Sequence, residues 1–183
     1  MPLLTWSKSV SENSTSMPEA DVPSPSPVAV WTATAAGLGR LRPAPGTWGS
    51  LPALFFAWPV LVLTDGWWTS AICATLALVV ALLGWWVVPA AGRAFDRDDP
   101  GEVVIDEVAG LLATYACLPW WNATILQADW LILVAGFVVF RLFDILKPWP
   151  ISACDAWHGV HGIMADDLVA GLLAALVLAP WLV

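Results

Sequence analysis

Apolar residues run through this chain in long segments, and short polar stretches interrupt them. Residues 70–88 and 130–140 contain no acidic or basic side chain. Because an α-helix rises about 1.5 Å per residue, roughly 20 apolar residues cross the hydrocarbon core of a bilayer. The pattern therefore predicts membrane helices.

The positions of these segments predict an all-α fold, a polytopic bundle of about five membrane-associated helices. A short apolar helix is expected at 29–36, followed by a stretch at 37–50 that is too rich in Gly and Pro for a helix interior. Several of the later segments are short for a full crossing, so tilt or partial burial is expected. The five helices are expected at 51–63, 69–91, 106–120, 130–146 and 166–183, with polar loops at 92–102 and 151–165 and a turn at 121–129.

The first 27 residues differ from the rest of the chain. They are rich in serine and proline and contain no long apolar run, which is typical of disordered segments. We expect a disordered tail at 1–27 and one membrane domain at 28–183.

Composition supports the membrane prediction. Of all residues 59% are hydrophobic and 12% are charged, whereas a soluble domain carries about 25% charged residues. Many of the 14 tryptophans end apolar runs, where indole meets the lipid headgroups.

The net charge of -8 argues against binding to nucleic acid. The three cysteines form no C-x-x-C pair, so neither a zinc site nor a redox motif is indicated.

The basic residues predict an orientation. If the helices alternate in direction, six bases fall on one side, and the opposite loops hold only Asp65 and Asp129. The positive-inside rule then places the polar segments in the cytoplasm and the C-terminus on the far side. The six bases are Arg40, Arg42, Arg93, Arg97, Arg141 and Lys147.

Two acidic pairs stand out in a chain with so little charge. Asp106-Glu107 and Asp166-Asp167 are each expected to open a helix, and a glycine follows each pair after four or five residues. One pair alone is equally well explained as a helix cap. Charges at the edge of the hydrocarbon are costly and tend to be functional, and small residues let helices approach closely. Two facing acidic pairs predict a Mg²⁺ site with oxygen ligands.

A third segment mixes both charges. Arg141, Asp144 and Lys147 follow one another at intervals of three, so they share one face of the expected helix. They form either a structural ladder of ion pairs or a site in which the carboxylate meets metal or water and the cations hold phosphate oxygens.

Two other polar stretches carry weaker signals. Near Arg40, the glycine Gly46 offers a backbone N–H to an anion and Thr47 offers a hydroxyl, although a re-entrant turn explains the same residues. His158 and His161 lack a third His or Cys ligand nearby, so a zinc site is not expected. A role near phosphate, as hydrogen-bond donor or acid, stays open for them.

These residues together resemble the phosphatidylglycerophosphatase A family of bacterial inner-membrane lipid phosphatases. The similarity extends from about residue 33 to 182, and its most specific parts are KPWPI at 147–151 and GIM at 162–164 followed by Asp166-Asp167. Further matches are APGTWGSL at 44–51, Ile105 to Glu107 with Gly110, Phe140-Arg141 with Asp144, Asp155, and Ala170-Gly171.

The resemblance implies a Mg²⁺-dependent phosphatase that converts phosphatidylglycerophosphate to phosphatidylglycerol on the cytoplasmic face of the inner membrane. Direct attack by water is favoured over an aspartyl-phosphate, since no D-x-D-x-T/V signature is present. A transporter or channel is the alternative, but the acids are expected at helix starts on one face. The implied roles are catalysis by Asp144, Lys147, Arg141 and Asp155, substrate binding by Thr47, Gly46, Arg40 and His161, and metal binding by Asp106, Glu107, Asp166 and Asp167.

Overall fold

The computed structural model describes residues 26–64, 66–118 and 129–181, and all regular secondary structure in these ranges is helical. This confirms the predicted all-α class. The first 25 residues of the expected tail lie outside the described residues, as does most of the expected turn at 121–129. The elements are α1 (Pro27–Ala33), η1 (Leu38–Arg40), α2 (Pro45–Gly49), α3 (Leu51–Leu63), α4 (Trp67–Phe95), α5 (Ile105–Cys117), α6 (Asp129–Leu146), α7 (Ile151–Asp155), α8 (Val160–Leu178) and η3 (Ala179–Trp181).

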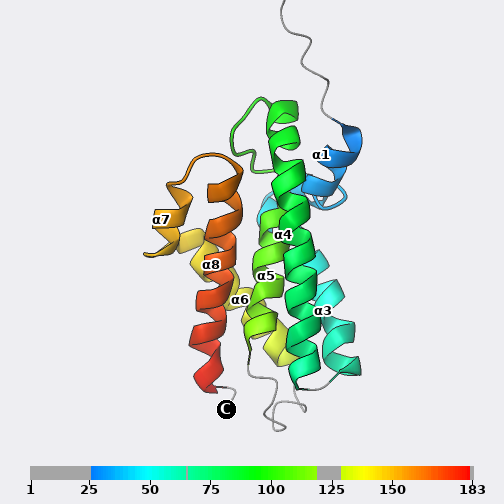
Figure 1. Ribbon diagram of the computed structural model, residues 1–183, viewed down its shortest axis with the longest axis vertical. Helices are drawn as coiled ribbons and strands as arrows, with labels where there is room; N and C mark the ends of the chain where they lie inside the picture. The colour runs from blue at the N-terminus through cyan, green and yellow to red at the C-terminus, as the bar shows by residue number, and fades with distance from the viewer. Residues whose placement is uncertain (1–25, 65, 119–128, 182–183) are drawn as a thin grey trace, which may run out of the picture.

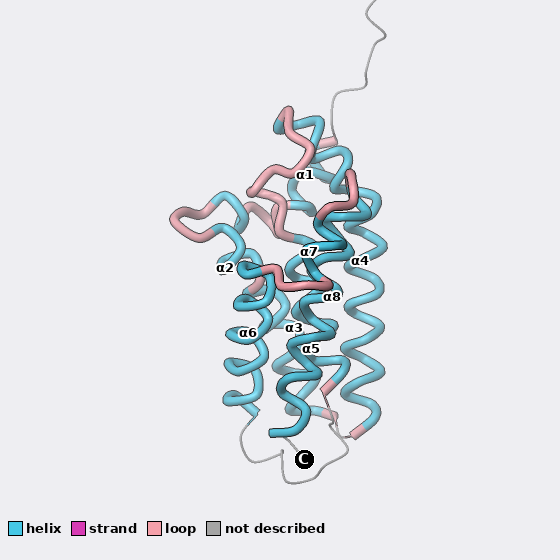
Figure 2. The backbone as a smooth tube through the Cα atoms, turned by 90° about the vertical axis from the view of Figure 1, so that its left-hand side faces the viewer, coloured by secondary structure: helices cyan, strands magenta, loops and turns pink. Residues whose placement is uncertain are grey.

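The longer helices lie side by side and alternate in direction (Figure 1). Helices α4 and α6 end where α5 and α8 begin, and we call this the polar end of the bundle. Figure 2 shows the longer loops and the short helices α1 and α7 gathered there, with the chain's C-terminus at the opposite end. The structure therefore brings together the polar segments that the sequence placed on one side.

Three helical segments within the described residues are long and apolar enough to cross a membrane, namely Pro45–Leu63, Trp67–Phe95 and Val160–Trp181. Large apolar side chains cover their outer surface. Phe55 is 76% exposed, Leu63 78% and Trp86 74%, which would be unfavourable in water but suits contact with lipid. These exposed side chains support a membrane-associated bundle.

Helix α5 is the centre of the bundle. It packs against α3, α4, α6 and α8, so residues on several of its faces are buried, including Leu111, Leu112 and Tyr115. Helices α5 and α8 approach most closely at two glycines: a Cβ added to Gly171 would lie 2.1 Å from the backbone oxygen of Gly110. The predicted close packing of these helices through small residues is confirmed.

The prediction that Asp166-Asp167 opens the last helix is wrong. Helix α8 begins at Val160, after Gly159 with its positive φ of 70°, and the acidic pair lies in the second turn. The helix begins earlier because Met164 is fully buried in the core and fits against Gly84 of α4. Capping therefore does not explain this acidic pair.

The structure also changes three expected loops. Helix α4 runs through Pro89 to Phe95, and short helices occupy 45–49 and 151–155. In α2 the two glycines do not break the helix because they are buried contacts: a Cβ on Gly49 would lie 2.3 Å from Cβ of Val104. The two glycines of α2 therefore reflect close packing and do not mark a loop.

Candidate active site

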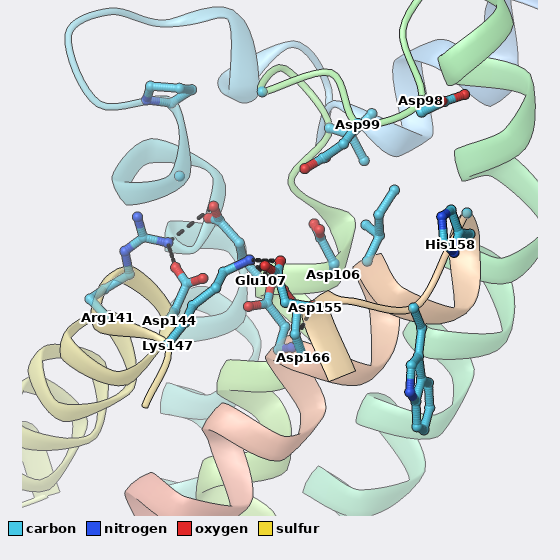
Figure 3. A pocket seen from close by; sticks show the side chains of 18 of the residues that line it. Asp98, Asp99, Asp106, Glu107, Arg141, Asp144, Lys147, Asp155, His158 and Asp166 are labelled. Atoms are coloured by element: carbon cyan, nitrogen blue, oxygen red, sulfur yellow. Dashed lines mark hydrogen bonds and ion pairs between the residues drawn. The ribbon is translucent and has the colours of Figure 1, made fainter. Parts of the chain in front are cut away.

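A cavity of about 600 Å³ opens at the polar end, between α2, the loop before α5, the end of α6, and α7 and α8 (Figure 3). Eight acidic side chains and two basic ones line it. The acids are Asp98, Asp99, Asp106, Glu107, Asp144, Asp155, Asp166 and Asp167, and the bases are Arg141 and Lys147. The cavity therefore holds every residue for which a catalytic or metal-binding role was expected.

Arg141 connects α6 to α5. Its Nη1 lies 2.6 Å from Oδ2 of Asp144 and 3.0 Å from Oε1 of Glu107. The hydroxyl of Ser50 donates to the other oxygen of Glu107 at 3.1 Å. Gly46 lies directly against this pair, since an added Cβ would be 2.0 Å from Oε1 of Glu107 and 2.6 Å from Nη2 of Arg141. A side chain at this position would displace the ends of Glu107 and Arg141.

Lys147 makes a separate pair of contacts. The end of α6 leads into a left-handed backbone conformation at Lys147, with a φ of 42°. Its ammonium donates to Oδ2 of Asp166 at 2.6 Å and also to Oδ1 of Asp155. The expectation that Lys147 shares a helix face with Asp144 is therefore wrong, because α6 ends at Leu146 and the chain then turns toward α7 and α8. The ion-pair ladder is formed only between Arg141 and Asp144.

Two of the buried acids in the cavity have no cation beside them, unlike the exposed Asp98 and Asp99, whose charges face solvent. Among the described residues, Asp106 and Asp167 make no ion pair, although they are only 9% and 3% exposed. Oδ1 of Asp106 is buried and has no hydrogen-bond partner in the described part of the chain. A buried carboxylate oxygen without a partner is costly, so this pair differs from Glu107 and Asp166, which hold the two bases.

The pKa values of the acids at the start of α5 reflect this burial. Both residues lie outside the three candidate spans. Burial raises the pKa of Glu107 to about 7, although Arg141 acts in the opposite direction. Burial, followed by the negative charge of Glu107, raises the pKa of Asp106 well above its ordinary value. A nearby positive charge would keep Asp106 ionised at neutral pH.

The donor chemistry of Asp106 and Asp167 fits a hard divalent cation. Magnesium takes carboxylate oxygens and water as ligands. Asp106 lines this cavity, and its Oδ1 has no hydrogen-bond partner among the described residues. The described residues nevertheless contain no ready-made group of three or more His, Cys, Asp or Glu ligands. Two buried acids, Asp106 and Asp167, are thus free to bind a cation, while Glu107 and Asp166 are engaged by Arg141 and Lys147.

Of the four expected substrate-binding residues, one lines the acid-rich cavity and three do not. Gly46 lines the cavity. Thr47 is exposed, and neither Thr47 nor Arg40 lines it. His161 also lies outside, because its Nδ1 accepts a hydrogen bond of 3.0 Å from Nε1 of Trp85 on α4. His158 does line the cavity (Figure 3).

Some cavity residues were missed by reasoning from the sequence. Ser50 was not assigned a role, although it donates to Glu107. Asp98 and Asp99 were placed in a loop without a function, and they line the cavity near Asp106 (Figure 3). Their position a few residues before the acidic start of α5 was a signal in the sequence.

The fold and this cavity define a membrane-associated helical protein with an acid-rich site at one end, the arrangement expected of a lipid phosphatase. The family model for phosphatidylglycerophosphatase A matches residues 31–181. The chain belongs to the phosphatidylglycerophosphatase A family, a family of phosphatases.

Three relatives are similar over most of their length. Phosphatidylglycerophosphatase A of Escherichia coli is 36% identical over 151 residues, covering 81% of this chain and 81% of that protein. The protein of the same name in Haemophilus influenzae is 33% identical, covering 77% and 80%. A Bacteroides thetaiotaomicron protein named "Putative phosphatidylinositol-3-phosphatase" is 30% identical, covering 85% and 94%. No solved structure matches the chain.

Proposed function

We propose that this protein hydrolyses phosphatidylglycerophosphate to phosphatidylglycerol and phosphate, with Mg²⁺, in the synthesis of phosphatidylglycerol. Membership of the family and the names of two relatives support the reaction. The cavity at the polar end supports the same reaction, because two bases and two buried acids that are paired with neither base line it together.

The unpaired acids carry this proposal. Asp106 and Asp167 would hold Mg²⁺ through carboxylate oxygens, because neither acid is paired with a lysine or arginine of the described residues. A bound magnesium ion would polarise the phosphoryl oxygens and offset the repulsion between the acidic cavity and a phosphomonoester. Glu107 and Asp166, which were also expected as metal ligands, would instead position the two bases.

The remaining residues act on the phosphate and on water. Arg141 and Lys147 would donate hydrogen bonds to phosphoryl oxygens and offset the charge that builds up on them. Asp144 lies next to Arg141 and would orient the attacking water and accept its proton. Asp155 would fix the position of Lys147 through their ion pair. Water attacks phosphorus, the bond from phosphorus to the glycerol oxygen breaks, and the proton accepted by Asp144 would pass to that oxygen to give the hydroxyl of phosphatidylglycerol.

The location of the site suits a lipid substrate. The acyl chains would stay beside the exposed apolar surface while the headgroup enters the polar end. The six bases of the sequence support a cytoplasmic orientation for this end in the bacterial inner membrane. A transporter or channel is not favoured, since eight acids gather in one cavity at the polar end of the bundle.

The direct test is a comparison of substrates. Purified protein in detergent is given phosphatidylglycerophosphate, phosphatidic acid or phosphatidylinositol 3-phosphate, each with Mg²⁺, and phosphate release is measured. We expect the highest kcat/KM with phosphatidylglycerophosphate. A clear preference for phosphatidylinositol 3-phosphate would favour the activity named for the Bacteroides relative and contradict the proposed substrate.

A further inference from the structure

A second cavity, of about 460 Å³, lies next to the acid-rich one at the polar end. Pro45 and Gly101 line both cavities, so the two share a wall. We call the second cavity the arginine pocket. It is lined by Arg40, Arg42 and Arg97 together with Gly39, Pro43, Pro45, Phe95, Gly101 and Glu102.

The two cavities have opposite charge. Eight acids and two bases line the first, whereas three arginines and a single glutamate line the arginine pocket. Charges of one sign that line a cleft reinforce one another's electric field and attract ions of the opposite sign. A metal ion would be needed to bring an anion into the first cavity, but the arginine pocket attracts an anion without one.

Contacts from three parts of the chain build the arginine pocket. The guanidinium of Arg40 lies over the ring of Phe95, 5.7 Å from its centroid, and Nη1 of Arg97 lies 3.8 Å from Oε2 of Glu102. Gly39 packs against the backbone of Glu102, because an added Cβ would lie 2.1 Å from that carbonyl oxygen. These contacts join η1, the end of α4 and the loop before α5 around one space.

The proposed substrate carries two phosphates on one glycerol headgroup. The terminal phosphate is the monoester that is cleaved, and the other is the diester that links the glycerol to the lipid. A diester keeps one negative charge throughout the reaction, and the acid-rich cavity offers it no unoccupied base. Two adjoining cavities, one for each phosphate, match a headgroup of this kind.

We propose that the arginine pocket binds the phosphodiester of the lipid while the acid-rich cavity holds the phosphomonoester. This inference rests on the proposed function and adds the basis of its specificity. Phosphatidic acid has only one phosphate and could not occupy both cavities. Arg40 and Arg42 would thus select the two-phosphate headgroup through charge-assisted hydrogen bonds.

A kinetic comparison tests the proposal in purified full-length protein in uncharged detergent. The variants are Arg40→Gln and Arg42→Gln, and the matched control is Arg93→Gln, an exposed base at the same end that does not line the arginine pocket. We expect each test variant to raise the KM for phosphatidylglycerophosphate about tenfold, the effect of losing one hydrogen bond to a charged group. The rate with phosphatidic acid should not fall.

A binding experiment keeps this inference separate from the proposed function. Glycerophosphoglycerol, which carries the diester and no monoester, is titrated with each protein in the absence of metal and followed by ³¹P NMR. We expect the wild type and Arg93→Gln to shift the signal and the Arg40→Gln/Arg42→Gln variant to lose the shift.

The outcomes are distinct. Binding that the arginine substitutions do not weaken would overturn the inference, as would an absence of binding to the wild type. An equal loss of activity with both lipids would instead mean that the arginines attract anionic lipid surfaces in general. If the diester binds as expected but phosphatidylglycerophosphate is not cleaved, the proposed function fails while the diester site remains.

Discussion

The ammonium nitrogen of Lys147 lies 2.6 Å from Oδ2 of Asp166 and so connects the end of α6 to α8. Lys147 also pairs with Asp155 of α7. Because the side chain of Asp166 is only 7% exposed, its charge depends on this lysine for a partner. These contacts raise the pKa of Lys147 above its ordinary range even though burial opposes them, so the residue stays cationic when it meets phosphate.

Replacing this lysine separates its structural role from its catalytic role. Lys147→Met leaves Asp166 buried without a cation, and we expect a loss of about 1–3 kcal/mol of stability together with loss of activity. The double variant Lys147→Met/Asp166→Asn should recover stability but not activity. Thermal unfolding in detergent and phosphate release measure the two effects, and recovery of activity in the double variant would contradict a role for Lys147 in the reaction.

Gly46 tests whether the position of Arg141 matters. In Gly46→Ala the new methyl group would occupy the space of Glu107 Oε1 and Arg141 Nη2. Side-chain ends can move, so the fold should persist, but a displacement of about 1 Å at a reacting group costs roughly 100-fold in rate. We expect a fall of that order in kcat with little change in the unfolding temperature. Unchanged kcat would show that the Arg141–Glu107 pair is not part of the site.

The packing of α5 against α8 predicts a purely structural effect. A methyl group in Gly171→Ala would press on the backbone oxygen of Gly110, which cannot move without separating the two helices. We expect a loss of about 1–3 kcal/mol of stability, as for other overpacked sites. Leu172→Ala is the matched control, since Leu172 is 50% exposed on the same helix and should change stability much less. Equal effects of the two substitutions would contradict the close crossing.

The orientation of the bundle in the membrane gives a prediction in cells. If the polar end faces the cytoplasm, the C-terminus at the other end lies outside it (Figure 2). A C-terminal reporter that is active only in the cytoplasm should be silent, and one that is active only outside should give a signal. A bright cytoplasmic reporter would reverse the proposed orientation.

Much of the fold follows from the apolar pattern. The segment 51–63 is α3 residue for residue, and the expected helices at 106–120 and 130–146 begin within one residue of α5 and α6. The start of α8 could not be found from polarity. Met164 is buried against Gly84 of α4, which is distant in the sequence, and such a contact is not visible in a local pattern of glycines and histidines.

The sequence predicted which residues form the site more completely than it predicted which of them make ion pairs with one another. The two acidic pairs and the two bases, Arg141 and Lys147, do meet in one cavity. Their spacing could not show that Lys147 leaves the helix and pairs with α7 and α8, since this depends on where α6 ends and on its left-handed backbone at Lys147. The separation of paired acids from the unpaired Asp106 and Asp167 needs the folded structure in the same way.

Release of phosphate from phosphatidylglycerophosphate by purified protein, with Mg²⁺ or with a chelator, tests the central claim most directly. Asp167→Asn is measured beside Asp96→Asn, a matched change at an exposed position that does not line the acid-rich cavity. We predict release by the wild type and Asp96→Asn that requires Mg²⁺, and a loss of at least about 100-fold in Asp167→Asn. Equal release in the presence of chelator, or full activity of Asp167→Asn, would contradict a magnesium-dependent site built on the unpaired acids.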